Sequence, residues 1–306
     1  MSRKVISLIG APTDVGAPIQ GASMGPQALR VAGLTEALTQ EGCSVIDRGD
    51  VQGPSNPRQA PHEGYRHLNE VVVWNQMVYA EVFSTLAAGH LPMLLGGDHC
   101  LAIGSLSAVA QHCRRAGKAL KVIWLDAHAD FNTVELSPSG NMHGMPLSIL
   151  CGMGPDALTR LCGLPSPALS SENICQVGVR SVDPGERRLL HELDVKVFDM
   201  RYIDEHGMRT TMEFALQDIT PQTHVHVSLD VDFLDPCIAP GVSTAVHGGP
   251  TYREAELCME MLYDTHLLGS LDVMELNPAC DIRNSTATLV VTLLRSLFGR
   301  STLLRP

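Results

Sequence analysis

The stretch KVIWLDAHAD, residues 121–130, starts as an apolar run and ends in acidic and imidazole side chains. The expected strand covers 121–126, and its near-continuous apolar run is typical of a strand buried on both faces of a parallel sheet. Alternate side chains of an extended chain point to the same side, so Asp126, His128 and Asp130 are expected to converge. This stretch therefore predicts a strand of a parallel α/β sheet with a polar site at the end of that strand.

Comparable apolar runs alternate with segments of helical periodicity along the rest of the chain. The other expected strands cover residues 5–9, 44–47, 92–95, 173–179, 196–199, 224–230 and 270–275. The expected helices cover residues 26–40, 69–88, 101–116, 184–193, 204–216, 251–265 and 286–298. Thr251 and Glu254 form a capping box at the start of one of these helices. Strands that alternate with helices predict a parallel sheet covered by helices on both faces.

The composition excludes several classes of protein. The chain has 306 residues, a formal net charge of −11, 44% hydrophobic residues and 18% charged residues, which is typical of a folded domain and not of a disordered chain. Its longest apolar runs are far shorter than the roughly 18 residues of a membrane-spanning helix, and its acidic balance disfavours nucleic acid as a partner. No shift in composition divides the chain, so a single domain over residues 1–306 is expected.

Cysteine usage indicates a reducing compartment. The chain has nine cysteines, an odd number, and no C-x-x-C pair, which does not resemble a disulfide framework. We therefore expect a cytoplasmic protein in which most cysteines pack as small apolar side chains.

Three other expected strand ends carry residues of the same kind. They read Gly96-Gly97-Asp98-His99, Asp230-Val231-Asp232 and Glu275-Leu276-Asn277-Pro278. In open α/β sheets, functional sites lie beyond the carboxyl ends of the strands. Carboxylates crowded at such an edge repel one another, and cations between them relieve the repulsion. The pattern therefore predicts a metal site and not merely a set of helix caps.

The expected metal ligands are four carboxylates and two imidazoles, without a thiolate. They are His99, Asp126, His128, Asp130, Asp230 and Asp232. This set suits Mn²⁺, with Fe²⁺, Co²⁺ and Ni²⁺ as alternatives. Six ligands are many for one ion with an open position, and they suit two ions about 3.5–4 Å apart. Such a pair ionises a bridging water near neutral pH, which predicts hydrolysis at an electron-poor carbon or phosphorus.

The same residues resemble the metal motifs of the ureohydrolase superfamily, which includes arginases, agmatinases, guanidinobutyrases and formimidoylglutamases. The resemblance covers nearly the whole chain, and it implies an α/β fold, a single three-layer α/β/α domain on an eight-stranded parallel sheet. It also implies two Mn²⁺ ions per subunit. By this resemblance, His99 and Asp130 would hold one ion, His128 and Asp232 the other, and Asp126 and Asp230 would bridge them.

Two further segments, residues 131–144 and 179–186, resemble bacterial-type arginases within this superfamily. By that resemblance, Asn132 and Ser139 would hold the α-carboxylate of the substrate, and Asp183 would bind its α-ammonium group. The implied reaction converts L-arginine and water to L-ornithine and urea, through attack of a metal-bridging hydroxide on the guanidinium carbon.

The resemblance also implies roles for residues at the reacting centre. Glu275 would orient the guanidinium group, Thr244 would face it, and His143 would deliver a proton to the leaving amine. Asp130 is counted with His143 and Glu275 as a catalytic residue. The superfamily further implies a homo-oligomer, either a trimer or a hexamer. The alternatives are a ureohydrolase for another guanidino compound, such as agmatine or guanidinobutyrate, and a non-catalytic regulatory homologue.

Five residues carry separate expectations. Ser243 stands where the family commonly has glycine, so a left-handed backbone there would be strained. Glu135 adds a charge near the expected site and should point to solvent. His224 and His226 lie at the start of their strand, the wrong end for the site, and are expected to be structural. Asp272 is a candidate to fix a metal-ligating histidine.

Overall fold

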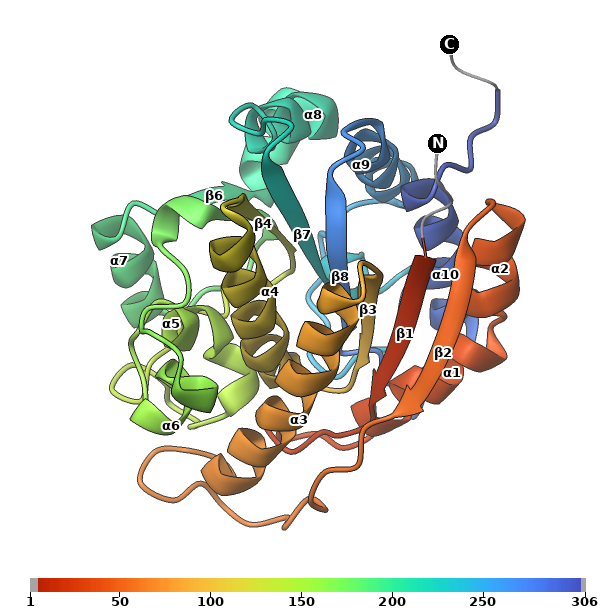
Figure 1. The fold of residues 1–306 in the computed structure, drawn as a ribbon. Helices are drawn as coiled ribbons and strands as arrows, with labels where there is room; N and C mark the ends of the chain where they lie inside the picture. Colours follow the sequence, from red (N-terminus) through yellow and green to blue (C-terminus); the bar gives the residue numbers. More distant parts are fainter. Residues whose placement is uncertain (1–4, 304–306) are drawn as a thin grey trace.

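Eight parallel strands form one sheet in the computed structural model, which describes residues 5–303 (Figure 1). The strands are β1 (Val5–Ala11), β2 (Ser44–Asp50), β3 (Leu91–Gly96), β4 (Ala119–Leu125), β5 (Ile174–Val179), β6 (Lys196–Asp199), β7 (Thr223–Asp230) and β8 (Leu268–Met274). Their order across the sheet is β2-β1-β3-β8-β7-β4-β5-β6, and every pair is parallel. The predicted α/β class with an eight-stranded parallel sheet is confirmed.

The burial of the strands explains why the sequence encodes them as continuous apolar runs. Strands β3, β5 and β7 are buried along their whole length, whereas β2 lies at an edge of the sheet and is largely exposed. Because all strands are parallel, their carboxyl ends share one edge, the lower edge in Figure 1. The loops that leave this edge carry the candidate site.

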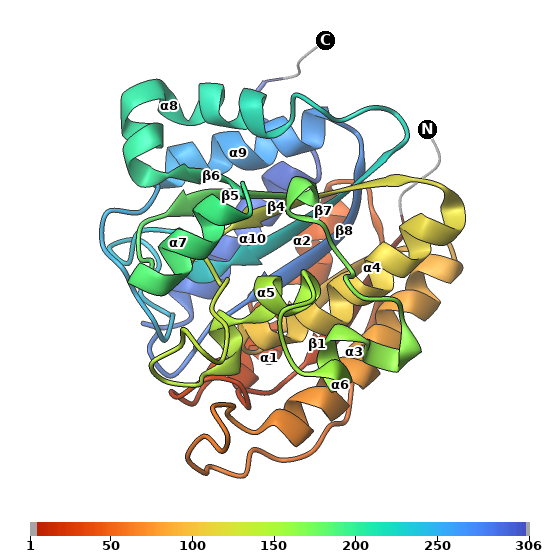
Figure 2. The same cartoon turned by 90° about the vertical axis from the view of Figure 1, so that its left-hand side faces the viewer.

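Helices cover both faces of the sheet, as Figure 2 shows with α8, α9 and α10 on one side and α3, α4 and α5 on the other. They are α1 (Gly25–Val31), α2 (Leu34–Gln40), α3 (Leu68–Ala87), α4 (Ala102–Ala116), α5 (Pro146–Leu150), α6 (Asp156–Thr159), α7 (Pro184–Glu192), α8 (Met200–Ala215), α9 (Tyr252–Asp264) and α10 (Ser285–Leu297). Short 3-10 turns lie at Ala22–Met24, His99–Leu101, Met142–Gly144, Leu161–Gly163, Ser171–Asn173 and Val231–Phe233.

Glycines change two of the predicted helices. The helix expected over 26–40 is divided into α1 and α2, because Gly33 has a left-handed φ of 81°. Helix α8 begins earlier than expected, where the Asp199 side chain accepts a hydrogen bond from the Tyr202 N–H, and Gly207 interrupts it with a φ of 81°. The predicted capping box at the start of α9 is present. Helices α5 and α6 were not predicted, because one turn of helix carries no readable period.

Apolar cores fill the space on both faces of the sheet. One core joins the sheet to α1, α2, α8, α9 and α10, and the cores on the other face join it to α3, α4, α5 and α7. Burying one such Leu or Ile side chain contributes about 1.5–3 kcal/mol to stability. The sheet is therefore a firm support for the loops at its carboxyl edge.

Two expectations concern the chain as a whole. Within residues 5–303, none of the helices combines the length and the apolar character needed to cross a bilayer. The expectation of a single domain covers residues 1–306, and its ends, 1–4 and 304–306, lie outside the described residues.

Candidate active site

All six predicted metal ligands lie together at the carboxyl edge of the sheet. His99 follows β3, Asp126, His128 and Asp130 follow β4, and Asp230 and Asp232 lie at the end of β7. All are buried except His128, whose side chain is 27% exposed. Parallel strands therefore bring residues that are far apart in sequence to one point, as predicted.

One half of this group surrounds His99. Its Nδ1 atom lies 3.0 Å from Asp230 Oδ2, 3.2 Å from Asp130 Oδ2 and 3.3 Å from Asp126 Oδ2. His99, Asp126 and Asp230 offer donor atoms that all lie within 4.8 Å of one another. This spacing is that of ligands around a single ion.

The other half surrounds His128 and shares a carboxylate with the first. His128 Nδ1 lies 3.1 Å from Asp232 Oδ2 and 3.6 Å from Asp126 Oδ1. Asp126, His128 and Asp232 form a second set of donor atoms within 4.8 Å of one another. Asp126 presents one oxygen to each half, which is the arrangement of a carboxylate able to bridge two ions.

A serine hydroxyl and an aromatic ring hold the His99 ring in place. Its ring stacks on Trp124 with centroids 4.1 Å apart, and its Nε2 shares a 2.8 Å hydrogen bond with Ser228 Oγ. The Trp124 indole N–H also donates to Asp126 Oδ2 at 2.8 Å. Since Nε2 is engaged, Nδ1 is the atom that faces the carboxylates.

The electrostatics of the group favour positive charge. Burial alone would lower the pKa of His99, but hydrogen bonds to three carboxylates raise it well above its usual value. His128 is also desolvated, yet Asp232 and Asp126 raise its pKa to about 12. Burial and the charge of Asp126 raise the pKa of Asp130 to about 6. The carboxylates thus favour positive charge on the two imidazoles. The same donor set, oxygen with two imidazoles, fits divalent cations.

Glu275 and His143 lie beside this group. Glu275 Oε1 is 3.0 Å from His143 Nδ1 and accepts a 2.9 Å hydrogen bond from the His99 N–H. Glu275 Oε2 is buried without a hydrogen-bond partner among the described residues. Burial would lower the pKa of His143, but Glu275 outweighs it and raises that pKa to about 9. A buried free acceptor at this point suits a cationic donor.

A cavity of about 160 Å³ opens onto the group. Its walls include the candidate ligands His128, Asp130 and Asp230 together with the predicted substrate-binding residues Asn132, Ser139, Asp183 and Thr244, and also His143. Asn132 Nδ2 donates to Asp183 Oδ2 at 3.1 Å, and Asn132 Oδ1 is buried without a partner within residues 5–303. Three of the predicted metal ligands therefore line the same cavity as four of the predicted substrate-binding residues.

The chain resembles known proteins over nearly its whole length. The Arginase family profile matches residues 4–299. The arginase of Bacillus caldovelox is 44% identical over 301 residues, which are 97% of this chain and 98% of that protein. The chain belongs to the arginase family.

Solved structures of this family and of a related enzyme have the same fold. The native structure of Bacillus caldovelox arginase at pH 5.6 matches with a TM-score of 0.92 and 42% identity, covering 98% of this chain and 100% of that one. A hypothetical agmatinase from Burkholderia thailandensis matches less well, with a TM-score of 0.71 and 26% identity over 97% of this chain and 85% of that one. The prediction of an enzyme of this hydrolase family is confirmed.

The structure gives a role to Glu186, which the sequence analysis left without one although it lies in the arginase-like segment 179–186. Glu186 is buried, lines the cavity, and accepts hydrogen bonds from the N–H groups of Phe131 and Asp183 at 2.8 and 3.2 Å. Burial is the main reason that its pKa is raised to about 7. The spacing Asp183-x-x-Glu186 is that of a capping box, and this pattern in the sequence could have pointed to Glu186. Glu186 ties the segment after β4 to the start of α7.

Three of the separate expectations have clear outcomes. Ser243 is absent from the described residues with positive φ, so no strain arises there, and its Oγ accepts a 2.8 Å hydrogen bond from Asn277. Glu135 is exposed, as predicted. The prediction for Asp272 was wrong, because it contacts His226 at 3.3 Å and Ser105 at 2.6 Å instead of a candidate metal ligand.

Proposed function

We propose that this chain is an arginase that hydrolyses L-arginine to L-ornithine and urea. The observation that carries the proposal is the shared cavity, whose walls join candidate ligands His128, Asp130 and Asp230 to the substrate-binding candidates Asn132, Ser139 and Asp183. A guanidinium at the ligand end and an amino-acid head group at the other end would each meet groups of suitable charge. The names of the relatives, arginases of 40–44% identity, support the same substrate.

We propose that two Mn²⁺ ions are held by the six ligands that the resemblance implies. His99 and Asp130 would hold one ion, His128 and Asp232 the other, and Asp126 and Asp230 both. When bound, such a pair supplies a water that ionises near neutral pH and can attack the guanidinium carbon. The shared position of Asp126 between the two sets of donors supports a pair of ions.

The head group of the substrate would be bound by neutral donors and one acid. The Asn132 amide has two hydrogens, of which one is donated to Asp183, so the other is available to the α-carboxylate together with the Ser139 hydroxyl. Asp183 would accept hydrogen bonds from the α-ammonium group. A charge-assisted bond of this kind contributes about 1.5–3 kcal/mol.

At the reacting end, Glu275 and His143 would act on opposite parts of the guanidino group. Glu275 Oε2, which is buried and unpartnered within the described residues, would accept N–H bonds from the guanidinium and orient its carbon. His143, 3.0 Å from Glu275 and on the cavity wall, would donate its proton to the nitrogen that leaves as the ornithine amine. Thr244, whose hydroxyl donates to Asp232 at 3.0 Å, would border the guanidinium.

Urea release after loading with Mn²⁺ tests this proposal. We expect the highest kcat/KM for L-arginine among L-arginine, agmatine and 4-guanidinobutyrate. A higher value for agmatine would contradict the roles of Asn132 and Ser139, and release from none of the three would favour a non-catalytic homologue. Loading in parallel with Co²⁺ and Ni²⁺ tests the choice of metal.

The variant Asp183→Asn tests the head-group contact. Asparagine keeps the capping role that Asp183 has at the start of α7 but removes the charge. We expect KM for L-arginine to rise about 10- to 100-fold, with little change for 4-guanidinobutyrate, which lacks the amine. Unchanged arginine kinetics would disprove the contact.

We further propose that the protein is cytoplasmic and forms a trimer or hexamer. Free thiols at every cysteine support a reducing compartment. Exposed apolar side chains of Met24, Val31 and Ile282 support an interface near α1, where Asn284 bonds to the Ala28 carbonyl. Light scattering on the metal-loaded protein would test the assembly, and a monomeric mass would contradict it.

A further inference from the structure

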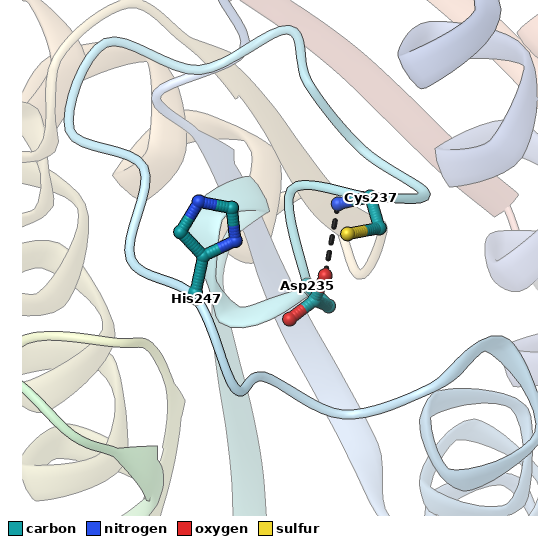
Figure 3. Close-up of side chains that lie close together, drawn as sticks. All are labelled: Asp235, Cys237 and His247. Atoms are coloured by element: carbon teal, nitrogen blue, oxygen red, sulfur yellow. Dashed lines mark hydrogen bonds between the residues drawn. The ribbon is translucent and has the colours of Figure 1, made fainter.

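A second cluster of possible metal ligands lies on the loop between β7 and α9. Asp235, Cys237 and His247 offer a carboxylate, a thiol and an imidazole whose ligand atoms all lie within 4.8 Å of one another. Figure 3 shows the three side chains gathered on this loop, with the sulfur of Cys237 directed toward the His247 ring. Cys237 and His247 are exposed, so an ion could reach them from solvent.

The carboxylate of this cluster is already held in place. Asp235 Oδ1 accepts a 2.9 Å hydrogen bond from the Cys237 N–H, and Asp235 Oδ2 accepts bonds of 2.8 and 3.0 Å from Gly248 and Gly249. Slight burial acts to raise the pKa of Asp235, but these bonds lower it to about 2. The carboxylate is therefore ionised, and its position ties the two ends of the loop together.

The backbone on both sides of His247 is also anchored. The Val246 carbonyl accepts hydrogen bonds from Arg180 Nε and Nη2 at 3.1 and 2.8 Å, and the Gly248 N–H donates to Asp235. Arg180 is pinned in turn by donating to the Asp232 carbonyl at 2.8 Å. Because these hydrogen bonds already hold the main chain, an ion that binds here orders little of it, and the entropic cost of binding is low.

We propose that Asp235, Cys237 and His247 form a binding site for one zinc-like divalent cation, separate from the buried group at the ends of β3, β4 and β7. Three protein ligands with one water complete the tetrahedral coordination that Zn²⁺ prefers. The thiol distinguishes this site chemically from the buried group, because soft sulfur selects zinc over manganese. Hydrogen bonding to Asp235 raises the pKa of the Cys237 thiol, and a bound cation reverses this effect by deprotonating it.

The site has a consequence for the neighbouring cavity. Thr244 lies three residues before His247, and its hydroxyl donates to Asp232 at 3.0 Å. A cation that joins His247 to Asp235 and Cys237 closes the loop around Thr244 and holds that segment more firmly against the cavity.

Cobalt titration of the Mn²⁺-loaded protein tests the site. A cysteine thiolate bound to Co²⁺ gives a sulfur-to-cobalt charge-transfer absorption, and the buried group, which contains no cysteine, cannot produce it. We expect this absorption to saturate at one equivalent and to disappear when Zn²⁺ is added. Cys237→Ser should abolish it, His247→Asn should weaken binding at least about tenfold, and the matched surface variant Cys162→Ser should leave it unchanged.

Three results would overturn the proposal. They are the absence of the absorption in the parent protein, its loss in Cys162→Ser, and unaltered affinity in His247→Asn, which would indicate binding by a single thiol. All of these readouts are independent of urea release, so they stand or fall separately from the proposed arginase activity.

Discussion

Two groups of imidazole and carboxylate side chains share strand β7, and only one of them has the charge balance of a metal centre. The group at the carboxyl edge places four carboxylates around two imidazoles and opens onto a cavity. The inner group, defined by Ser105, His224, His226, Ser270 and Asp272, has two imidazoles and one carboxylate. Both groups contain histidine and aspartate, but the ratio of carboxylates to imidazoles is four to two in the outer group at the carboxyl edge and one to two in the inner group.

Hydroxyl groups supply the hydrogen bonds of the inner group, whose remaining polar atoms, His226 Nε2 and Asp272 Oδ2, lie 3.3 Å apart. Ser270 Oγ bonds to His224 Nε2 and His226 Nδ1 at 2.9 and 2.8 Å, and Ser105 donates to Asp272 at 2.6 Å. Burial and the neighbouring His226 lower the pKa of His224 to about 3, whereas the carboxylates raise those of His99 and His128. Excess negative charge, more than the presence of His and Asp, distinguishes a metal site from a structural network.

The largest effect is expected from Asp126→Asn in the outer group. This change removes the carboxylate shared by both sets of donors, so bound metal should fall and urea release should drop more than about 100-fold. Elemental analysis and a urea assay measure the two effects. Normal metal content in this variant would contradict the shared role of Asp126.

Removal of Mn²⁺ should affect the outer group and leave the inner group unchanged. A cation present at about 100 times its Kd stabilises the folded state by about 2.7 kcal/mol per site, so dialysis against a chelator should lower the free energy of unfolding by at least that amount. Urea denaturation with and without Mn²⁺ measures the difference. Identical unfolding curves would show that the carboxylates are accommodated without a cation.

Asp272→Asn makes the same substitution in the inner group and serves as the matched control for Asp126→Asn. It weakens the contact with His226 and leaves buried polar atoms less well paired, which should cost about 1–3 kcal/mol of stability. Metal content and the Mn²⁺-dependent gain in stability should not change. Loss of metal in Asp272→Asn would show that the two groups act as one.

The smallest effect concerns pH and His224. The unfolded chain takes up a proton near pH 6.5, whereas the native imidazole does so only near pH 3. The native state is therefore favoured above pH 6.5, and this contribution is lost as the pH falls toward 3. Between pH 7.5 and 5.5, the parent should lose about 1.4 kcal/mol more than His224→Gln in urea denaturation. Equal losses would indicate a protonated His224.

Much of the fold and the site could be predicted, because two short-range regularities encode them. Continuous apolar runs marked the strands, and the two-residue alternation of Asp126, His128 and Asp130 marked the point where they meet. Parallel strands then bring their carboxyl ends together whatever the order of the strands. The six ligands could therefore be gathered without knowledge of that order.

The missed features depend on contacts between distant segments. The pairing of Asp272 with His226 requires the register of β7 against β8, which no local pattern specifies. Glu186 could be read as part of a helix cap, but its bond to Phe131 depends on how the loop after β4 folds against the start of α7. The cluster of Asp235, Cys237 and His247 likewise arises only when the loop closes on itself.

Two of the candidate site residues have backbones that suit glycine better than an acid. Asp130 and Glu275 have φ values of 51° and 62°, a region in which a non-glycine residue costs of order 1–3 kcal/mol. Selection for heat resistance alone would thus favour replacing both acids. Efforts to make this protein more thermostable should leave positions 130 and 275 untouched, since the most stable sequence there is expected to be an inactive one.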